Sequence, residues 1–185
     1  VYKRQTIDVA QFRGPDLITD LTKRDFTLNA MAVLLTGSMQ DVVDPTGGLE
    51  DLAAGQLRHC TPDSIPEDPI RALRAIRASV TFKLIIEAET RASIKQHVTA
   101  LASISPERIR DEFVQILVSN QPAAALTALY HLGLLQQIVP ETSAIQNVKQ
   151  SAPHQFTVWR HTLQTVEQLN LLLATISPQR NHDTT

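Results

Sequence analysis

The stretch between Glu67 and Arg77 holds the side chains of this sequence that are best suited to bind phosphates or bases. It reads as an acidic pair, a proline and then arginines at every third position: Glu67, Asp68, Pro69, Arg71, Arg74 and Arg77. Arginine offers a planar fork of N–H donors that matches phosphate oxygens and base edges. A helical face that serves only solubility usually mixes lysine with glutamate, so this pattern predicts a binding surface.

The same stretch predicts a helix that begins at Pro69 and runs to about Phe82. Proline suits the first turn, where its missing N–H would be unpaired, and acidic residues suit a helix N-terminus. At about 100° per residue, the helix has an apolar stripe and a charged stripe. The first contains Leu73, Ile76 and Val80, and the second contains Asp68, Arg71 and Arg74, with Arg77 at the border. We therefore expect a buried helix that presents a carboxylate and guanidinium groups to a cleft.

Several stretches, in the right order, resemble motifs of the class II nucleotidyltransferases, the family of the tRNA CCA-adding enzymes and bacterial poly(A) polymerases. Residues 67–77 resemble motif D, residues 23–32 motif B, residues 44–58 motif C and residues 104–113 motif E. The resemblance covers roughly residues 6–139, with a weaker continuation to about residue 173. It implies a template-independent enzyme that adds C or A to the 3′ end of tRNA, using CTP and ATP.

The resemblance to motif B implies that residues 23–32 grip the incoming nucleotide. The family pattern is usually Arg-Arg-Asp-Phe-Thr-x-Asn-Ala, and Lys23 replaces the first arginine while keeping its charge. Arg24 would contact a phosphate, and Asp25 and Asn29 would lie near the ribose and the phosphates. The spacing also predicts a helix with the apolar stripe Leu28, Met31, Ala32 and Leu35. A capped core helix without any ligand is the alternative for this stretch.

Asp68 and Arg71 could select the base. Cytosine and adenine each present an amine donor beside a ring nitrogen acceptor, whereas uracil and guanine present a carbonyl beside an N–H. A carboxylate accepts from the amine and a guanidinium donates to the ring nitrogen, so this pair favours C and A. Arg74 and Arg77 would then bind the triphosphate or stiffen the cleft. In the alternative interpretation, Asp68 caps the helix and Arg71 pairs with a neighbouring acid.

Asp8 is the candidate catalytic and metal-binding residue. Residues 6–12 alternate as a strand does, and the family carries a metal-site carboxylate at this place. The family's two-metal chemistry implies Mg²⁺ as cofactor and needs more than one carboxylate. Its Gly-rich motif with an Asp-x-Asp pair would lie upstream. We therefore expect a piece of a longer protein that is inactive by itself.

The patterning predicts an α+β fold, with the remnant of a β-sheet head followed by a mostly helical neck and body. Residues 1–61 would be the C-terminal part of the head, 62–140 the nucleotide-selecting and RNA-binding neck, and 141–185 a linker and the start of a helical or HD-like body. We expect a loop at 14–20, a strand at 38–43 and a short extended link at 83–86. Helices are predicted at 87–101, from Pro106, at 122–132 and at 158–176, with motif E bracing the neck.

Composition adds few constraints on function. The 185 residues carry a formal net charge of −2, so RNA binding would depend on local patches. A single cysteine, Cys60, excludes an internal disulfide, and no apolar run reaches membrane-spanning length, so we expect a cytoplasmic protein without a membrane partner. The segment with His154 and His161 resembles the first histidine region of an HD-type phosphohydrolase module. The pair His182-Asp183 suggests a metal site, which we regard as a coincidence. A poly(A) polymerase and a non-catalytic RNA-binding or regulatory module remain the alternative functions.

Overall fold

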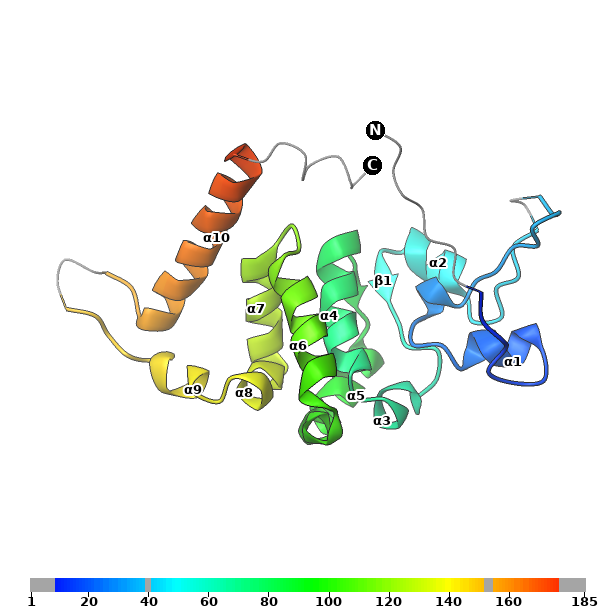
Figure 1. Cartoon of the computed structure of the whole chain (residues 1–185), viewed down its shortest axis with the longest axis horizontal. Coiled ribbons are helices and arrows are strands. Elements are labelled where there is room, and N and C mark those ends of the chain that lie inside the picture. The colour runs from blue at the N-terminus through cyan, green and yellow to red at the C-terminus, as the bar shows by residue number, and fades with distance from the viewer. Residues whose placement is uncertain (1–8, 39–40, 152–154, 177–185) are drawn as a thin grey trace.

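Helix α4 (Arg71–Phe82) lies at the centre of the structure (Figure 1). The computed structural model describes residues 9–38, 41–151 and 155–176. Helices α6 and α7 pack against α4, and the short elements α3, β1 and β2 also contact it. The elements from α1 to β1 form one end of the molecule, and α10 lies at the opposite end (Figure 1). The central helix therefore connects the N-terminal elements to the helical part of the chain.

Most of the regular structure is helical. The α-helices are α1 Leu17–Thr22, α2 Gly48–Ala53, α3 Ser64–Glu67, α4 Arg71–Phe82, α5 Ala88–Gln96, α6 Pro106–Leu117, α7 Pro122–His131, α8 Leu134–Ile138, α9 Thr142–Ile145 and α10 Val158–Ile176. The 3₁₀ helices are η1 Thr27–Asn29 and η2 Val98–Ser103, and the strands are β1 Gln56–Leu57 and β2 Ile85–Ile86. The fold class is α+β, as the sequence predicted.

Helix α4 is held by its apolar stripe. Leu73, Ala75 and Ile76 are fully buried, and they form the core together with residues of α6, α7 and α8. The helix ends at Lys83, whose φ of 56° is left-handed and stops the helical hydrogen bonding. Burying three such side chains stabilises the packing by an amount of the order of 1.5–3 kcal/mol for each large one.

The start of α4 differs from the prediction. The helix begins at Arg71, because Pro69 and Ile70 form a turn whose carbonyls accept from Ala72 and Leu73 three residues on. The acidic Glu67 belongs to the preceding short helix, α3. The kink between α3 and α4 moves Asp68 off the helix, into an extended conformation with φ −144° and ψ 90°.

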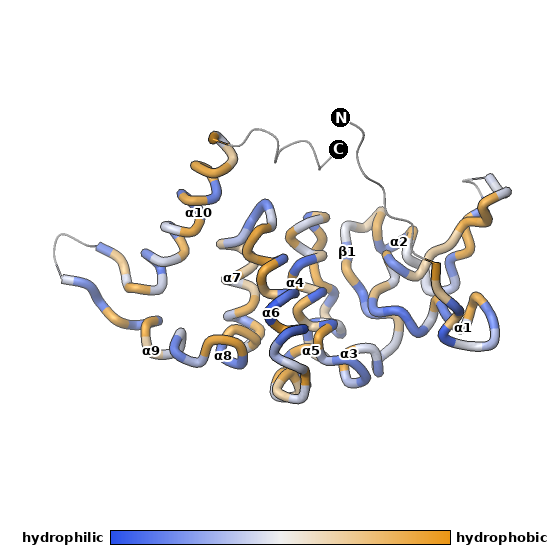
Figure 2. The backbone as a smooth tube through the Cα atoms, in the orientation of Figure 1, coloured by the Kyte–Doolittle hydropathy of each residue, from blue (hydrophilic) through white to orange (hydrophobic). Residues whose placement is uncertain are grey.

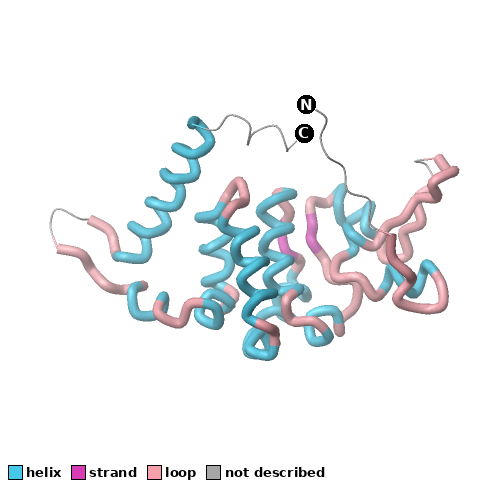
Figure 3. The backbone as a smooth tube through the Cα atoms, in the orientation of Figure 1, coloured by secondary structure: helices cyan, strands magenta, loops and turns pink. Residues whose placement is uncertain are grey.

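A two-stranded parallel sheet joins the N-terminal elements to the helical part (Figure 3). Strand β1 pairs with β2 in the register Gln56 to Ile85 and Leu57 to Ile86. The Glu87 N–H donates to the Leu57 carbonyl at 3.0 Å and continues the pairing past β2. Within the extended link predicted at 83–86, Ile85 and Ile86 thus form a strand, and its partner comes from the segment that was assigned to motif C.

The sheet predicted before Pro62 is smaller than expected in the described residues. Apart from β1, this part holds two isolated antiparallel bridges, Phe26 with His59 and Ala32 with Val43. Residues 9–12 of the strand predicted at 6–12 are not in a strand, and the rest of it, with Asp8, lies outside the described residues. The strand predicted at 38–43 is reduced to the bridge at Val43, with residues 39–40 outside the described part.

Two local predictions in the first forty residues were wrong. The loop expected at 14–20 contains helix α1, which starts because the Asp16 carboxylate accepts from the Thr19 N–H at 2.7 Å. The helix expected through Met31 is one 3₁₀ turn. It ends there because Ala32 pairs with Val43 through two backbone hydrogen bonds of 3.0 and 2.8 Å, which a continued helix would forbid.

The helices after residue 87 follow the prediction closely. Helix α5 with η2 fills the range predicted at 87–101, α6 starts at Pro106 as expected, and α7 ends before Gly133, whose φ is 78°. The linker predicted after residue 140 contains the short helix α9. The helical spacing of apolar residues predicts both Ile116 and Leu117 on the inner face of α6, but Leu117 is 38% exposed, whereas Ile116 is fully buried.

The apolar contacts of helix α10 with the core come from its first half. The helical spacing of Leu163, Val166, Leu169 and Leu173 predicts that all four face the core. Leu163 and Val166 do lie against it, but Leu169 and Leu173 are 52% and 40% exposed. In Figure 2 the C-terminal half of α10 accordingly contains orange, hydrophobic segments. No helix in the described part of the chain is both long and apolar enough to cross a membrane. His154 and the pair His182-Asp183 lie outside the described residues.

Helix α2 packs so closely on η1 that Gly48 has no room for a side chain. A Cβ at Gly48 would overlap the Thr27 carbonyl. Gly48→Ala should therefore lower the free energy of unfolding by about 1–3 kcal/mol, the usual range for overpacking. Urea unfolding of the two proteins measures this difference. Leu49→Ala is the matched control on the same helix, since Leu49 is 52% exposed and should change stability by less than about 0.5 kcal/mol. Equal stability of Gly48→Ala and the native chain would contradict the packing described here.

Candidate nucleotide-binding site

A polar cavity of about 450 Å³ lies where the N-terminal elements meet α4. Its lining residues are Arg13, Arg24, Asp25, Asn29, Asp68, Arg71 and Arg74. Six of the seven residues predicted to bind nucleotide are in this lining, although they come from two separate segments of the chain, 24–29 and 68–74. Four arginines face two aspartates, so the cavity has a formal excess of positive charge that favours a polyanion.

The motif B turn is built around Asp25. Its Oδ1 accepts from the Phe26 N–H at 2.9 Å and from the Asn29 side-chain amide at 3.1 Å. The Asp25 carbonyl accepts from the Cys60 N–H at 3.2 Å, which ties the turn to the segment after β1. Asp25 thus fixes the direction of Asn29, and both side chains face the cavity.

Arg24 is held by Asp20, a residue that the sequence analysis did not single out. Asp20 Oδ2 accepts from Arg24 Nε at 3.2 Å and Nη2 at 2.9 Å, and its Oδ1 accepts from the Arg13 N–H at 2.9 Å. These donors, first the Arg13 N–H and then the Arg24 guanidinium, lower the pKa of the Asp20 carboxyl although burial acts to raise it. The i, i+4 spacing of Asp20 and Arg24 was the available signal, but it fell in a segment predicted as loop.

A second carboxylate supports the motif B turn from behind. Asp51 is buried and accepts from the Thr27 hydroxyl at 2.6 Å and from Arg58 Nε at 3.0 Å. Arg58 also donates to the Thr46 carbonyl at 2.7 Å. Asp44 caps α2 by accepting from two backbone N–H groups, and these bonds lower its pKa although burial acts to raise it. Motif C therefore serves as the packing support of motif B in this structure.

Arg71 is buried and ties two segments together. Its Nη1 donates to the Ser64 carbonyl and its Nη2 to the Lys23 carbonyl, each at 3.1 Å. The acceptors are backbone oxygens, which differs from the alternative in which Arg71 pairs with an acid. Two of the five guanidinium N–H groups are used in this way, so the others remain able to donate into the cavity.

Arg74 and Arg77 share one carboxylate, Glu112 of α6. Arg74 Nε donates to Glu112 Oε1 at 3.2 Å and Arg77 Nε to Oε2 at 2.8 Å. Arg74 also reaches the cavity, with its Nη1 3.8 Å from Asp25 Oδ2. Among the described residues Arg77 lies outside the cavity lining, so its contacts match the stiffening role and not the triphosphate role.

Asp68 is paired with Arg108 of α6. Arg108 Nη2 donates to both carboxylate oxygens, at 3.0 and 2.8 Å. Among the described residues, no side chain caps helix α4. The alternative interpretation, in which Asp68 is this cap, is therefore wrong. Motif E contributes Glu112 and Arg108 to these contacts, which confirms the prediction that its acidic and basic side chains brace the neck.

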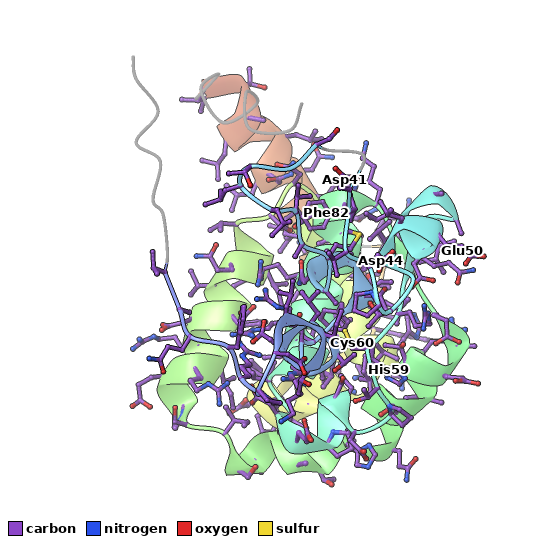
Figure 4. All side chains as sticks on the ribbon, turned by 90° about the vertical axis from the view of Figure 1, so that its right-hand side faces the viewer. Asp41, Asp44, Glu50, His59, Cys60 and Phe82 are labelled. Carbon is purple, nitrogen blue, oxygen red and sulfur yellow. The ribbon has the colours of Figure 1, made fainter. Side chains whose placement is uncertain are left out.

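The described residues offer no group of three or more His, Cys, Asp or Glu side chains that could hold a metal ion. Asp8, the predicted metal ligand, lies outside them. Cys60 lies near the middle of the molecule in the view of Figure 4. Burial, followed by the nearby Asp25 carboxylate, raises the pKa of its thiol to about 12, so it stays protonated at neutral pH. Cys60 is half-buried and free of any disulfide.

Comparison with known families gives two matches that follow each other along the chain. Residues 2–58 match the poly A polymerase head domain, and residues 83–146 match the probable RNA- and SrmB-binding site of polymerase A. A multifunctional CCA protein of Nitrosomonas europaea is 39% identical over 75% of this chain and 33% of its own length. An A-adding tRNA nucleotidyltransferase of Deinococcus radiodurans is 37% identical over 84% of this chain and 36% of its own length.

Solved structures agree with these matches. The Thermotoga maritima CCA-adding enzyme, complexed with tRNA, superposes with a TM-score of 0.67 at 26% identity, over 91% of this chain and 38% of that one. The Bacillus stearothermophilus CCA-adding enzyme in complex with CTP gives 0.60 at 33% identity, over 64% and 30%. Over most of its length the chain is similar to class II nucleotidyltransferases, the family of these tRNA nucleotidyltransferases. It spans about a third of the length of the curated relatives it matches.

The carboxylate of Asp20 should contribute to stability in a pH-dependent way. Because its folded pKa is lowered, its contribution is present above the ordinary carboxyl pKa of about 4 and is lost as the pH falls through the folded value. Asp20→Asn should lower the unfolding free energy by about 1–3 kcal/mol at pH 7. Urea unfolding from pH 7 to pH 3 should show this difference shrinking below about pH 4.

Glu167→Gln on the exposed side of α10 is the matched control, and it should leave the unfolding free energy nearly unchanged at both ends of the pH range. A constant difference between Asp20→Asn and the native chain over that range would mean that the ionised carboxylate does not hold Arg24 and Arg13.

Proposed function

We propose that the whole protein adds C and A nucleotides to the 3′ end of tRNA, from CTP and ATP and without a template. This chain would supply the nucleotide-selecting pocket and part of the RNA-binding surface. The single observation that carries the proposal is the cavity itself. It gathers the motif B residues Arg24, Asp25 and Asn29 with the motif D residues Asp68 and Arg71 around one space that suits a polar ligand.

The arginines of the cavity would bind the triphosphate. Arg24 and Arg74 are each fixed by a carboxylate, so their guanidinium groups are oriented before any ligand enters. Oriented donors in a partly enclosed site bind phosphate oxygens without first losing side-chain freedom. Asn29, which Asp25 orients, would donate to the ribose or to a phosphate.

Asp68 and Arg71 would read the base. A carboxylate that accepts from an exocyclic amine, beside a guanidinium that donates to a ring nitrogen, matches C and A and leaves unmatched groups against U and G. Discrimination by such a bidentate pair is of the order of 1–3 kcal/mol, as measured for base readout in nucleic acid grooves. Asp68 lies off the helix in the structure, so the pair depends on the kink between α3 and α4 and not on the helical spacing that the sequence suggested.

Mg²⁺ remains our proposed cofactor, with Asp8 as one of its ligands and further carboxylates supplied from upstream. Bound there, the metal would activate the 3′ hydroxyl and stabilise the leaving pyrophosphate. The described residues contribute the other functions: they bind, orient and select the nucleotide. We propose residues 1–61 as the end of the head, 62–140 as the neck and 141–185 as a linker and the start of a body. We also propose the cytoplasm as the location, because tRNA is the proposed substrate.

The relatives leave open which nucleotides are added. A CC-adding tRNA nucleotidyltransferase of Halalkalibacterium halodurans is 35% identical over 71% of this chain and 35% of its own length, a similarity close to that of the A-adding and CCA-adding relatives. The match of residues 83–146 to an RNA-binding site also favours an RNA-binding contribution of the neck by itself. The length and composition of the product on tRNA would distinguish CCA, CC-only, A-only and poly(A) addition.

Transfer activity should require the upstream part of the protein. The 185-residue chain, incubated with Mg²⁺, labelled CTP or ATP and tRNA lacking its terminal nucleotides, should incorporate no label. The longer parent should incorporate it, and Asp8→Ala should abolish most of that activity because one metal ligand is lost. Robust incorporation by the 185-residue chain would mean that its own residues form a complete active site, contrary to this proposal.

Asp68→Ala in the longer parent should reduce the preference for CTP and ATP over UTP and GTP by about tenfold, within the 1–3 kcal/mol expected of a base-reading pair. Steady-state kcat/KM for each nucleotide gives the ratio, and the melting temperature gives the stability of the same variant. Unchanged selectivity together with a lowered melting temperature would show that Asp68 has only a structural role.

A further inference from the structure

Arg108 occupies an unusual place beside the candidate site. It holds Asp68 through a single nitrogen, Nη2, which lies 3.0 and 2.8 Å from the two carboxylate oxygens. Among the described residues it is nevertheless outside the lining of the cavity. The arginine therefore approaches Asp68 from the α6 side, while the same carboxylate faces the cavity on its other side.

The cavity gives Asp68 strong competing partners. Arg13, Arg24, Arg71 and Arg74 all line the same space. The described residues have no ion pair within 4.0 Å between Asp68 and any of these four. A carboxylate left without Arg108 would turn toward the nearest guanidinium, because opposite charges attract strongly in a partly buried polar site. Such a pair would remove both an acceptor and a donor from base recognition.

We propose that Arg108 is a specificity-determining positioning residue that keeps the Asp68 carboxylate away from the arginines of the cavity. This inference rests on the proposed function, since it concerns how the same site distinguishes bases. Arg108 satisfies one side of the carboxylate, so that the other side is held ready for the amine of cytosine or adenine. It leaves the Arg71 donors free for the ring nitrogen. Arg108 does not itself contact the nucleotide.

The contact geometry predicts which substitution preserves the effect. One nitrogen contacts both oxygens, and a lysine ammonium can donate to two oxygens in the same way. Arg108→Lys should therefore retain most of the selectivity, whereas Arg108→Ala should lower it. Arg110→Ala is the matched control on the same helix, because Arg110 pairs with Asp111 at the surface, where both side chains are about two-thirds exposed.

The experiment measures kcat/KM for CTP and for UTP with the longer parent protein and its Arg108 and Arg110 variants, alongside their melting temperatures. Arg108→Ala should lower the CTP-to-UTP ratio about fivefold, the scale of a partly exposed ion pair. Arg108→Lys and Arg110→Ala should keep the ratio within about twofold of the native value.

Each other result has a distinct meaning. An unchanged ratio in Arg108→Ala with a lower melting temperature would overturn the inference, because Arg108 would then only brace the neck. A higher kcat/KM for CTP in Arg108→Ala would also overturn it, because Arg108 would then compete with the base. If the native parent shows no transfer, or no preference for CTP, the proposed function itself fails and this inference falls with it.

Discussion

The electrostatics of the candidate site depend on one constraint, which is the close approach of several guanidinium groups around a single cavity. Like charges at this distance repel, and the structure opposes the repulsion with partners placed behind the cavity wall. Asp20 holds Arg24, Glu112 holds Arg74, and the Ser64 and Lys23 carbonyls hold Arg71. The guanidinium groups are thereby fixed before a ligand arrives.

The fold supplies those partners from distant parts of the chain. Asp20 lies on α1, Glu112 lies on α6, and the acceptor carbonyls belong to the motif B segment and to α3. The parallel pairing of β1 with β2, and the packing of α2 on η1, hold the N-terminal elements against the helical part. We therefore expect a substitution outside the cavity lining, such as one at Gly48, to act on the site through its packing on the motif B turn.

Sequence patterns identified most residues that line the cavity but not the local structure that places them. The 3.6-residue spacing and the motif residues identified six of the seven cavity-lining side chains, because binding chemistry depends on residue type. The single-turn motif B and the kink before Arg71 were missed, because the bridge of Ala32 to Val43 and the Pro69 turn override local helical preference. Asp20 and Arg108 were not assigned to particular partners, because their contacts depend on which elements the fold brings together.

A crystal structure of the longer parent protein with CTP bound would test the central claim most directly. The account predicts that the cytosine amine lies about 3 Å from an Asp68 carboxylate oxygen, with Arg71 donating to the ring nitrogen and Arg108 still in contact with Asp68. The triphosphate should lie among Arg24, Arg74 and Asn29. A cytosine base bound away from Asp68 and Arg71, with the cavity empty of nucleotide, would contradict the account.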